Sequence, residues 1–152
     1  MEKQTTNWDW ISVGEVELLY RPKIKASERP LITQSKDAYH LLAGGWNFSR
    51  PDVPEEFKAL LLSQANRVLG LYHFTKGGIA DVKLLLAAAI KSNCTAIILC
   101  HNNPTGNLIP SETDKELTLK IYEAAKLFDI RLLDHLIVNS QGYMSFADEG
   151  LL

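Results

Sequence analysis

The sequence has few cysteines, and those it has do not suit a disulfide. Cys94 and Cys100 bound the segment CTAIILC, which has the composition of a single strand. An extended strand of that length separates the two Cα atoms by roughly 20 Å, about three times the span of a disulfide. We therefore expect two small buried residues on the same side of that strand. This cysteine usage is typical of a reducing compartment.

Long hydrophobic runs and a secretory leader are also missing. The longest apolar runs, LLLAAAI and TAIILC, are far shorter than the roughly 20 residues that span a bilayer. The first residues, MEKQTTNWDW, contain no basic region followed by an apolar run, so no secretory signal is visible. We expect a cytoplasmic protein that is not bound to a membrane by its own sequence.

The chain carries no excess charge of one sign. Its 16 lysines and arginines against 18 aspartates and glutamates give a formal net charge of −2, so there is no broad basic field. The one compact basic stretch, RPKIK at residues 21–25, has no interleaved aromatic beyond Tyr20. These features disfavour direct nucleic-acid binding.

The chain does have the size and composition of one globular domain. Its 152 residues, 46% of them hydrophobic, can bury a core without disulfides or a structural metal. We expect one domain over residues 1–152. Within it, residues 12–26 would form an N-terminal arm or edge strand, and residues 27–152 the main body.

Hydrophobic patterning predicts a mixed α/β sheet flanked by helices. Residues 13–20 alternate as a strand does, and its unpaired edge could join a second copy into a homodimer. Ser35 is a candidate N-cap for a short helix that Gly44 and Gly45 would end. The remaining expected elements are a β-hairpin (56–63 and 68–75), a helix (79–92), a central strand covered on both faces (94–100), a helix (111–130) and two strands (131–138 and 142–146).

A candidate site follows the expected central strand. His101 and Asn103, two residues apart at the end of that strand, should project together as a ligand pair. Asp114 falls in the first turn of the next helix, with Ser111 at its N-cap position. The intervening loop contains Pro104, Gly106 and Pro110, which can turn the chain back. We therefore expect an imidazole, an amide, a hydroxyl and a carboxylate around one cleft.

Each of these residues also has an ordinary structural explanation. Ser111 and Asp114 resemble a capping box, and a histidine at a strand end is most often only a polar terminus. Glu55 and Glu56, ahead of the apolar ALLLS, are individually typical of solvated residues. In LLDHLIV, His135 is more typical of a hydrogen-bonded interior residue than of a metal ligand, with Asp134 as its neighbour in that role.

Taken together, the stretch HNNPTGNLIPSETD resembles the JAMM motif of the MPN-fold metallopeptidases. That motif is His-x-His, seven residues, Ser, two residues, Asp, with a glutamate upstream, and its spacing is kept through His101, Asn103, Ser111 and Asp114. With LLDHLIV, YMSFADEGLL and SVGEVELLYRPKIKASERPLI, the similarity covers about residues 12–152 and is to the RadC-type proteins of bacteria. Longer RadC proteins carry a helix-hairpin-helix region before this domain, so we expect a standalone module.

The resemblance implies the MPN fold, a cytidine-deaminase-like three-layer arrangement, and a zinc site. By position, His101, residue 103 and Asp114 would hold zinc with water as the fourth ligand. Glu55, with Glu56 as the fallback, would be the general base, and Ser111 would stabilise the developing oxyanion. Zinc with three protein ligands keeps an open position and activates water, a carboxylate takes the proton, and a hydroxyl stabilises the transition state. The implied reaction is hydrolysis of a peptide or isopeptide bond in a peptide or protein substrate.

Asn103 departs from the motif, because the second ligand should be a histidine. An amide oxygen is a weaker zinc donor than an imidazole nitrogen, so zinc affinity should be weak or lost. Two functional classes therefore stay open. One is a metal-dependent hydrolase, and the other is an inactive MPN-fold module that binds a protein partner. The DNA-repair role attached to RadC proteins by name is a lesser alternative, since the charge of the chain gives it little support.

Overall fold

The structure is a computed structural model that describes residues 13–50 and 52–152. The expectations for residues 1–12, including the first residue of the N-terminal arm, lie outside the described residues.

The core of the fold is a five-stranded mixed sheet with the order β2-β1-β5-β6-β7. Its strands are β1 (Phe57–Leu62), β2 (Val68–His73), β5 (Ala96–Asn102), β6 (Arg131–Val138) and β7 (Tyr143–Ser145). β1 pairs antiparallel with β2, which confirms the expected hairpin, and antiparallel with β5 on its other edge. β6 runs parallel to β5 and antiparallel to β7. A separate two-stranded sheet is formed by β3 (Thr75–Lys76) and β4 (Ile79–Ala80).

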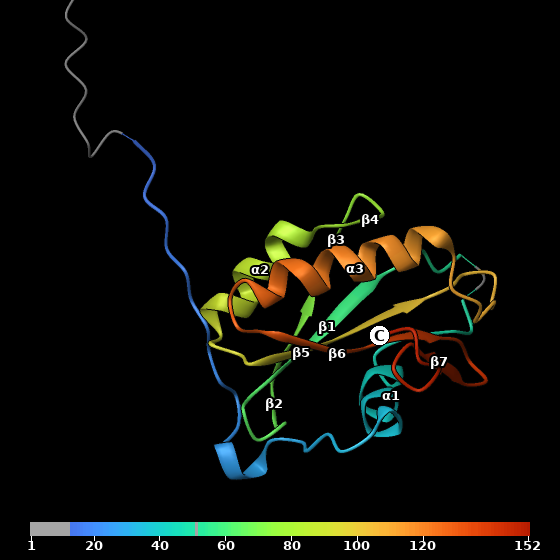
Figure 1. Cartoon of the computed structure of the whole chain (residues 1–152), viewed down its shortest axis with the longest axis horizontal. Coiled ribbons are helices and arrows are strands. Elements are labelled where there is room, and N and C mark those ends of the chain that lie inside the picture. The colour runs from blue at the N-terminus through green and yellow to red at the C-terminus, as the bar shows by residue number, and fades with distance from the viewer. Residues whose placement is uncertain (1–12, 51) are drawn as a thin grey trace, which may run out of the picture.

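Helices cover both faces of the sheet, as the three-layer arrangement requires. α2 (Val82–Lys91) and α3 (Glu112–Lys126) lie on one face, and α1 (Ser35–Ala43) lies on the other (Figure 1). A short 3₁₀ helix, η2 (Ala26–Glu28), precedes α1. Among the described residues, no helix combines the length and the apolar character needed to cross a bilayer. The α/β class and the mixed sheet flanked by helices are confirmed.

The central strand β5 divides the hydrophobic core into two clusters. Ile97 and Leu99 pack on the α2 and α3 side, whereas Ile98 and Cys100 pack on the α1 side. Successive strand residues point to opposite faces, so a strand with helices on both sides is apolar throughout. This confirms the prediction that the unbroken run of apolar residues marks a central strand.

The two cysteines do not share a side of the sheet, so that expectation is wrong. Cys94 belongs to the cluster beneath α2 and α3, and Cys100 belongs to the cluster beneath α1. The reason is that β5 begins only at Ala96, so strand alternation does not reach Cys94. Both cysteines are buried and free, in agreement with the exclusion of a disulfide.

Residues 13–20 form no strand, so the expectation of an edge strand there is wrong. This segment lies outside every ladder and is largely exposed. The arm meets the sheet at Tyr20, whose hydroxyl donates to the carbonyl oxygen of Leu69 in β2 at 2.6 Å. An alternating pattern stabilises a strand only when a neighbouring strand takes its backbone hydrogen bonds. The homodimer stays a prediction, and the free sheet edge near the arm belongs to β2.

Ser35 is the first residue of α1 and not its N-cap. Gln34 is the N-cap, and it shares a capping box with Asp37. The Ser35 hydroxyl instead donates to Asp148 near the C-terminus, at 2.5 Å. The expected end of the helix is confirmed, because Gly44 is its C-cap.

A buried carboxylate in β6 fastens the C-terminal segment to the sheet. Asp134 accepts hydrogen bonds from the Ser145 hydroxyl at 2.6 Å, the Ala147 backbone N–H at 3.0 Å and the His135 backbone N–H at 2.7 Å. These bonds join β6 to the turn after β7. His135 is completely buried and hydrogen-bonded, which confirms the interior role expected for this pair.

Candidate metal centre

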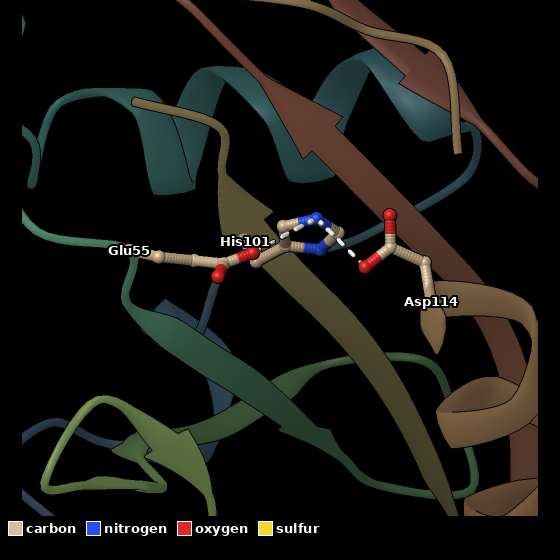
Figure 2. Close-up of side chains that lie close together, drawn as sticks. All are labelled: Glu55, His101 and Asp114. Carbon is tan, nitrogen blue, oxygen red and sulfur yellow. Dashed lines mark ion pairs between the residues drawn. The ribbon is translucent and has the colours of Figure 1, made fainter. Parts of the chain in front are cut away.

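Three side chains from separate parts of the chain meet at the carboxyl end of β5. Glu55 lies two residues before β1, His101 is the penultimate residue of β5, and Asp114 lies in the first turn of α3. His101 Nε2 lies 3.5 Å from Asp114 Oδ1 and 3.8 Å from Glu55 Oε1. One donor atom from each residue lies within 4.8 Å of the other two. Figure 2 shows the imidazole lying between the two carboxylates.

The pairing of β1 with β5 brings Glu55 to His101. Phe57 is the register partner of His101, so the residues just before Phe57 run past the end of β5. The Asn102 side chain fixes this segment, because its amide donates to the Pro54 carbonyl at 3.0 Å and its oxygen accepts from the Glu56 backbone N–H at 2.7 Å. The structure therefore brings Glu55, and not Glu56, next to the imidazole.

The start of α3 holds Asp114 through a capping box. The Ser111 hydroxyl accepts from the Asp114 backbone N–H at 3.0 Å, and Asp114 Oδ2 accepts from the Ser111 backbone N–H at 2.9 Å. The second carboxylate oxygen, Oδ1, is the one that faces His101. The capping box expected from the sequence is thus present, and it orients one candidate ligand. Because Ser111 accepts in this bond, its hydroxyl hydrogen stays available for donation.

Asn103 follows the last residue of β5, and its side chain forms hydrogen bonds within the loop that comes next. Its carboxamide oxygen accepts from the Thr105 backbone N–H at 3.0 Å and from the Thr105 hydroxyl at 2.7 Å. This is the Asx-turn geometry that asparagine favours in tight loops. The structure brings Glu55, His101 and Asp114 together, and it ties the amide oxygen of Asn103 to Thr105. The assignment of Asn103 as a ligand stays a prediction.

A buried hydrogen-bond chain lies behind the imidazole of His101. His101 Nδ1 lies 2.7 Å from His135 Nε2, and His135 Nδ1 lies 2.6 Å from Thr118 Oγ1. The Thr118 hydroxyl in turn donates to the Asp114 carbonyl oxygen at 2.6 Å. Aromatic rings hold the two imidazoles in place: Phe57 stacks on His101 at 4.9 Å between ring centroids, and Phe146 stacks on His135 at 4.7 Å.

The electrostatics of the site favour an uncharged imidazole beside carboxylates that lack a counter-ion. Burial lowers the pKa of His101, and the nearby charge of Asp114 offsets only part of this. Burial, followed by the charge of Asp114, raises the pKa of Glu55. Within residues 13–50 and 52–152, neither carboxylate forms an ion pair with a lysine or arginine. A divalent cation would relieve the repulsion between them.

Sequence reasoning missed three residues that build this site. Asn102 occupies the variable position of the motif, Thr118 lies outside the motif, and the interior role expected for His135 does not link it to His101. The only signal for Asn102 is that a polar side chain lies next to a candidate ligand. The only signal for His135 is that it is an interior histidine on a neighbouring strand. The register of β5 against β6 pairs Leu99 with His135. His101 lies two residues after Leu99 on the same face of β5, and its imidazole therefore reaches that of His135.

Comparison with known proteins gives a consistent assignment. The RadC-like JAB domain family matches residues 32–151. A UPF0758 protein of Flavobacterium johnsoniae is 41% identical over 128 residues, covering 79% of this chain and 53% of the relative. A UPF0758 protein of Porphyromonas gingivalis is 40% identical over 137 residues, covering 86% of this chain and 59% of the relative. The UPF0758 protein YfjY of Escherichia coli is 38% identical over 102 residues, which is 64% of each chain.

The chain spans about half to three fifths of the length of the first two relatives. The match nevertheless includes β1 to β7, the three helices and every residue of the candidate site. The resemblance first seen in the motif is therefore confirmed across most of the sequence. This chain belongs to the RadC-like JAB domain family.

Proposed function

We propose that this domain is a zinc-dependent hydrolase of peptide or isopeptide bonds whose metal site is weakened by Asn103. The observation that carries the proposal is the convergence of Glu55, His101 and Asp114, which come from three separate chain segments. Their donor atoms are one imidazole nitrogen and two carboxylate oxygens, all at the end of one strand. The capping box of α3 uses only Oδ2 of Asp114, so Oδ1 and the carboxylate of Glu55 remain to face the imidazole.

The donor set fits a divalent ion. Ligands bound at about 2.0–2.1 Å around a tetrahedral ion lie roughly 3.3 Å from one another. His101 Nε2 lies 3.5 Å and 3.8 Å from the two carboxylates, and all three donor atoms lie within 4.8 Å of one another, so a small contraction would complete the site. Nitrogen with two carboxylate oxygens suits zinc and also harder ions such as manganese. When bound, a divalent ion of this kind supplies Lewis-acid chemistry, which activates water and polarises a carbonyl group.

The side chains around this position have distinct parts in such a reaction. His101 is buried and Asp114 is half-buried, and these two residues would hold the ion. Glu55 is the most exposed of the three, with 42% of its side chain accessible, and its raised pKa suits a group that accepts and returns a proton. The Ser111 hydroxyl would donate to the oxygen on which negative charge develops. The substrate would be a peptide or a protein.

A specific observation also favours the second candidate, a binding module with an inactive site. The Asn103 amide oxygen is engaged by Thr105, so it would have to leave the loop before it could coordinate an ion. Without a ligand from position 103, Glu55 is the remaining third donor. A glutamate that coordinates the ion cannot also accept the proton of the attacking water. The asparagine at position 103 thus weakens both the affinity for the metal and the transfer of the proton.

The test is the metal content of the natural protein and of its Asn103→His variant, loaded with zinc and manganese under identical conditions and measured by elemental analysis. We expect weak, substoichiometric zinc in the natural protein and about one zinc per chain in the variant. Supplying the missing imidazole should raise affinity by at least about tenfold. His101→Ala in each background is the matched control, and it should hold no metal.

Each other outcome has a definite meaning. Metal in the variant alone, with no cleavage of peptide or isopeptide substrates by the natural protein, supports the binding module. Equal zinc affinity in both proteins contradicts the role given to Asn103. No metal in either protein contradicts the metal site itself.

A further inference from the structure

The hydrogen-bond chain behind the candidate metal site has a direction, and Thr118 fixes it. The Thr118 hydroxyl has one hydrogen, and it lies 2.6 Å from the backbone carbonyl oxygen of Asp114. A carbonyl oxygen can only accept, so that hydrogen must point to Asp114. Toward its other neighbour, His135 Nδ1, the hydroxyl can therefore only accept. His135 must carry its proton on Nδ1.

The next link follows from the burial of His135. Its ring is completely buried and, among the described residues, has no carboxylate partner, so the neutral form is the stable one. A neutral ring with its proton on Nδ1 presents a lone pair at Nε2. His101 Nδ1, which lies 2.7 Å from that atom, must then be the donor.

We propose that His135 and Thr118 are positioning residues that lock His101 in the tautomer whose Nε2 carries a lone pair facing Glu55 and Asp114. The opposite tautomer would point an N–H at the two carboxylates. The 3.5 Å and 3.8 Å separations from Nε2 are longer than an N–H···O hydrogen bond, so neither of these two carboxylates holds a proton on Nε2. The tautomer of His101 is therefore fixed by its hydrogen bond to the buried His135.

This tautomer of His101 is the one that can coordinate an ion through Nε2. The functional role of the fixed tautomer therefore rests on the function proposed above. Residues that fix the tautomer of a coordinating histidine typically contribute about ten- to a hundredfold to metal affinity. The usual partner in that position is a carboxylate or a backbone carbonyl. Here a second histidine takes its place, and a threonine on α3 orients that histidine. The same helix carries Asp114, so one element orients two of the three donor groups.

The lock is tested on the metal-free protein by reading imidazole ¹⁵N chemical shifts in a two-bond ¹H–¹⁵N correlation spectrum at about pH 7.5. We expect both His101 and His135 to be protonated on Nδ1. Thr118→Val removes the acceptor for His135 at nearly constant volume. The direction of the hydrogen bonds should then reverse, so that both His101 and His135 carry their proton on Nε2. Thr118→Ser keeps the hydroxyl and should keep the natural tautomers.

The second readout is zinc affinity, measured by titration in the Asn103→His background. Thr118→Val should bind zinc about tenfold more weakly than that background, whereas Thr118→Ser should stay within about twofold. Thermal unfolding of each variant checks that the fold is intact. A natural His101 protonated on Nε2, or an unchanged His101 tautomer in Thr118→Val, would overturn the proposal. If no variant binds zinc, the metal site is contradicted, while the ¹⁵N shifts still decide whether the lock exists.

Discussion

Lowering the pH from about 7.5 to about 5.5 is expected to destabilise the metal-free protein markedly, because two buried histidines must stay uncharged in the native state. Burial lowers the pKa of His101 and, more strongly, of His135 below the ordinary value of 6.5. In the unfolded chain both rings are hydrated and take up protons near that value. The unfolded state therefore binds more protons than the native state below pH 6.5, so the free energy of unfolding falls as the pH falls.

The size of this effect follows from proton linkage. His135 should contribute a loss of about 1.4 kcal/mol at a pH one unit below the unfolded pKa, and His101 up to the same amount. The raised pKa values of Glu55 and Asp134 act in the opposite direction, since those carboxyls take up protons more readily in the native state. Their contribution develops as the pH falls through the raised native pKa values, and it is complete only below the ordinary values of 4.5 and 3.8.

Urea unfolding in the presence of a chelator, repeated across this pH range, measures the slope directly. His135→Gln should be less stable at pH 7.5 but should lose less stability on acidification than the natural protein. His40→Gln, the same substitution on an exposed part of α1, is the matched control. If His135→Gln and the natural protein show the same pH dependence, a neutral buried His135 is the wrong description.

Asp134→Ala is expected to lower the free energy of unfolding by about 3 kcal/mol. The substitution removes three hydrogen bonds to a buried carboxylate, and it leaves the Ser145 hydroxyl and the Ala147 N–H without their acceptor. Hydrogen bonds to charged groups contribute about 1.5–3 kcal/mol each, but removing the buried charge recovers part of its desolvation cost. Denaturant unfolding with two probes, one of them sensitive to the C-terminal segment, measures the loss.

Asp134→Asn separates the hydrogen bonds from the charge. Its side-chain oxygen can still accept from the His135 and Ala147 backbone N–H groups, and its amide can donate to the Ser145 hydroxyl. We expect a loss below about 1 kcal/mol for this variant. A loss as large as that of Asp134→Ala would show that the carboxylate charge, and not its bonding pattern, stabilises the segment.

Most of the fold could be predicted from the sequence, because its helices and strands have strong local signals. The apolar run that became β5 predicted a central strand, and Ser111 with Asp114 predicted the start of α3. The failures share one physical cause. Residues 13–20 alternate like a strand, but a strand exists only where a neighbour takes its hydrogen bonds, and alternation does not reveal whether a neighbour is present. Alternation also does not show where a strand begins. The prediction therefore extended β5 to Cys94 and assigned this residue to the wrong side of the sheet.

The candidate site divides in the same way. The spacing of the motif selected His101, Asn103, Ser111 and Asp114, and the resemblance placed the upstream glutamate at Glu55 with Glu56 as the fallback. The spacing carried no information about Asn102, which fastens the segment that holds Glu55, nor about the loop hydrogen bonds that engage Asn103. These contacts depend on which backbone groups lie within about 3 Å, and that depends on the packed structure.

The sequence by itself determined the family, the three-layer class, the central strand and the two ends of the motif, since these follow from local patterning and spacing. The tertiary structure alone decided that Glu55 rather than Glu56 faces His101, and that His135 and Thr118 stand behind the imidazole. Those relations join residues as much as 46 positions apart, through the register of one strand against the next. Register is fixed only when the core packs, because shifting a strand by one residue would turn its buried side chains to the opposite face.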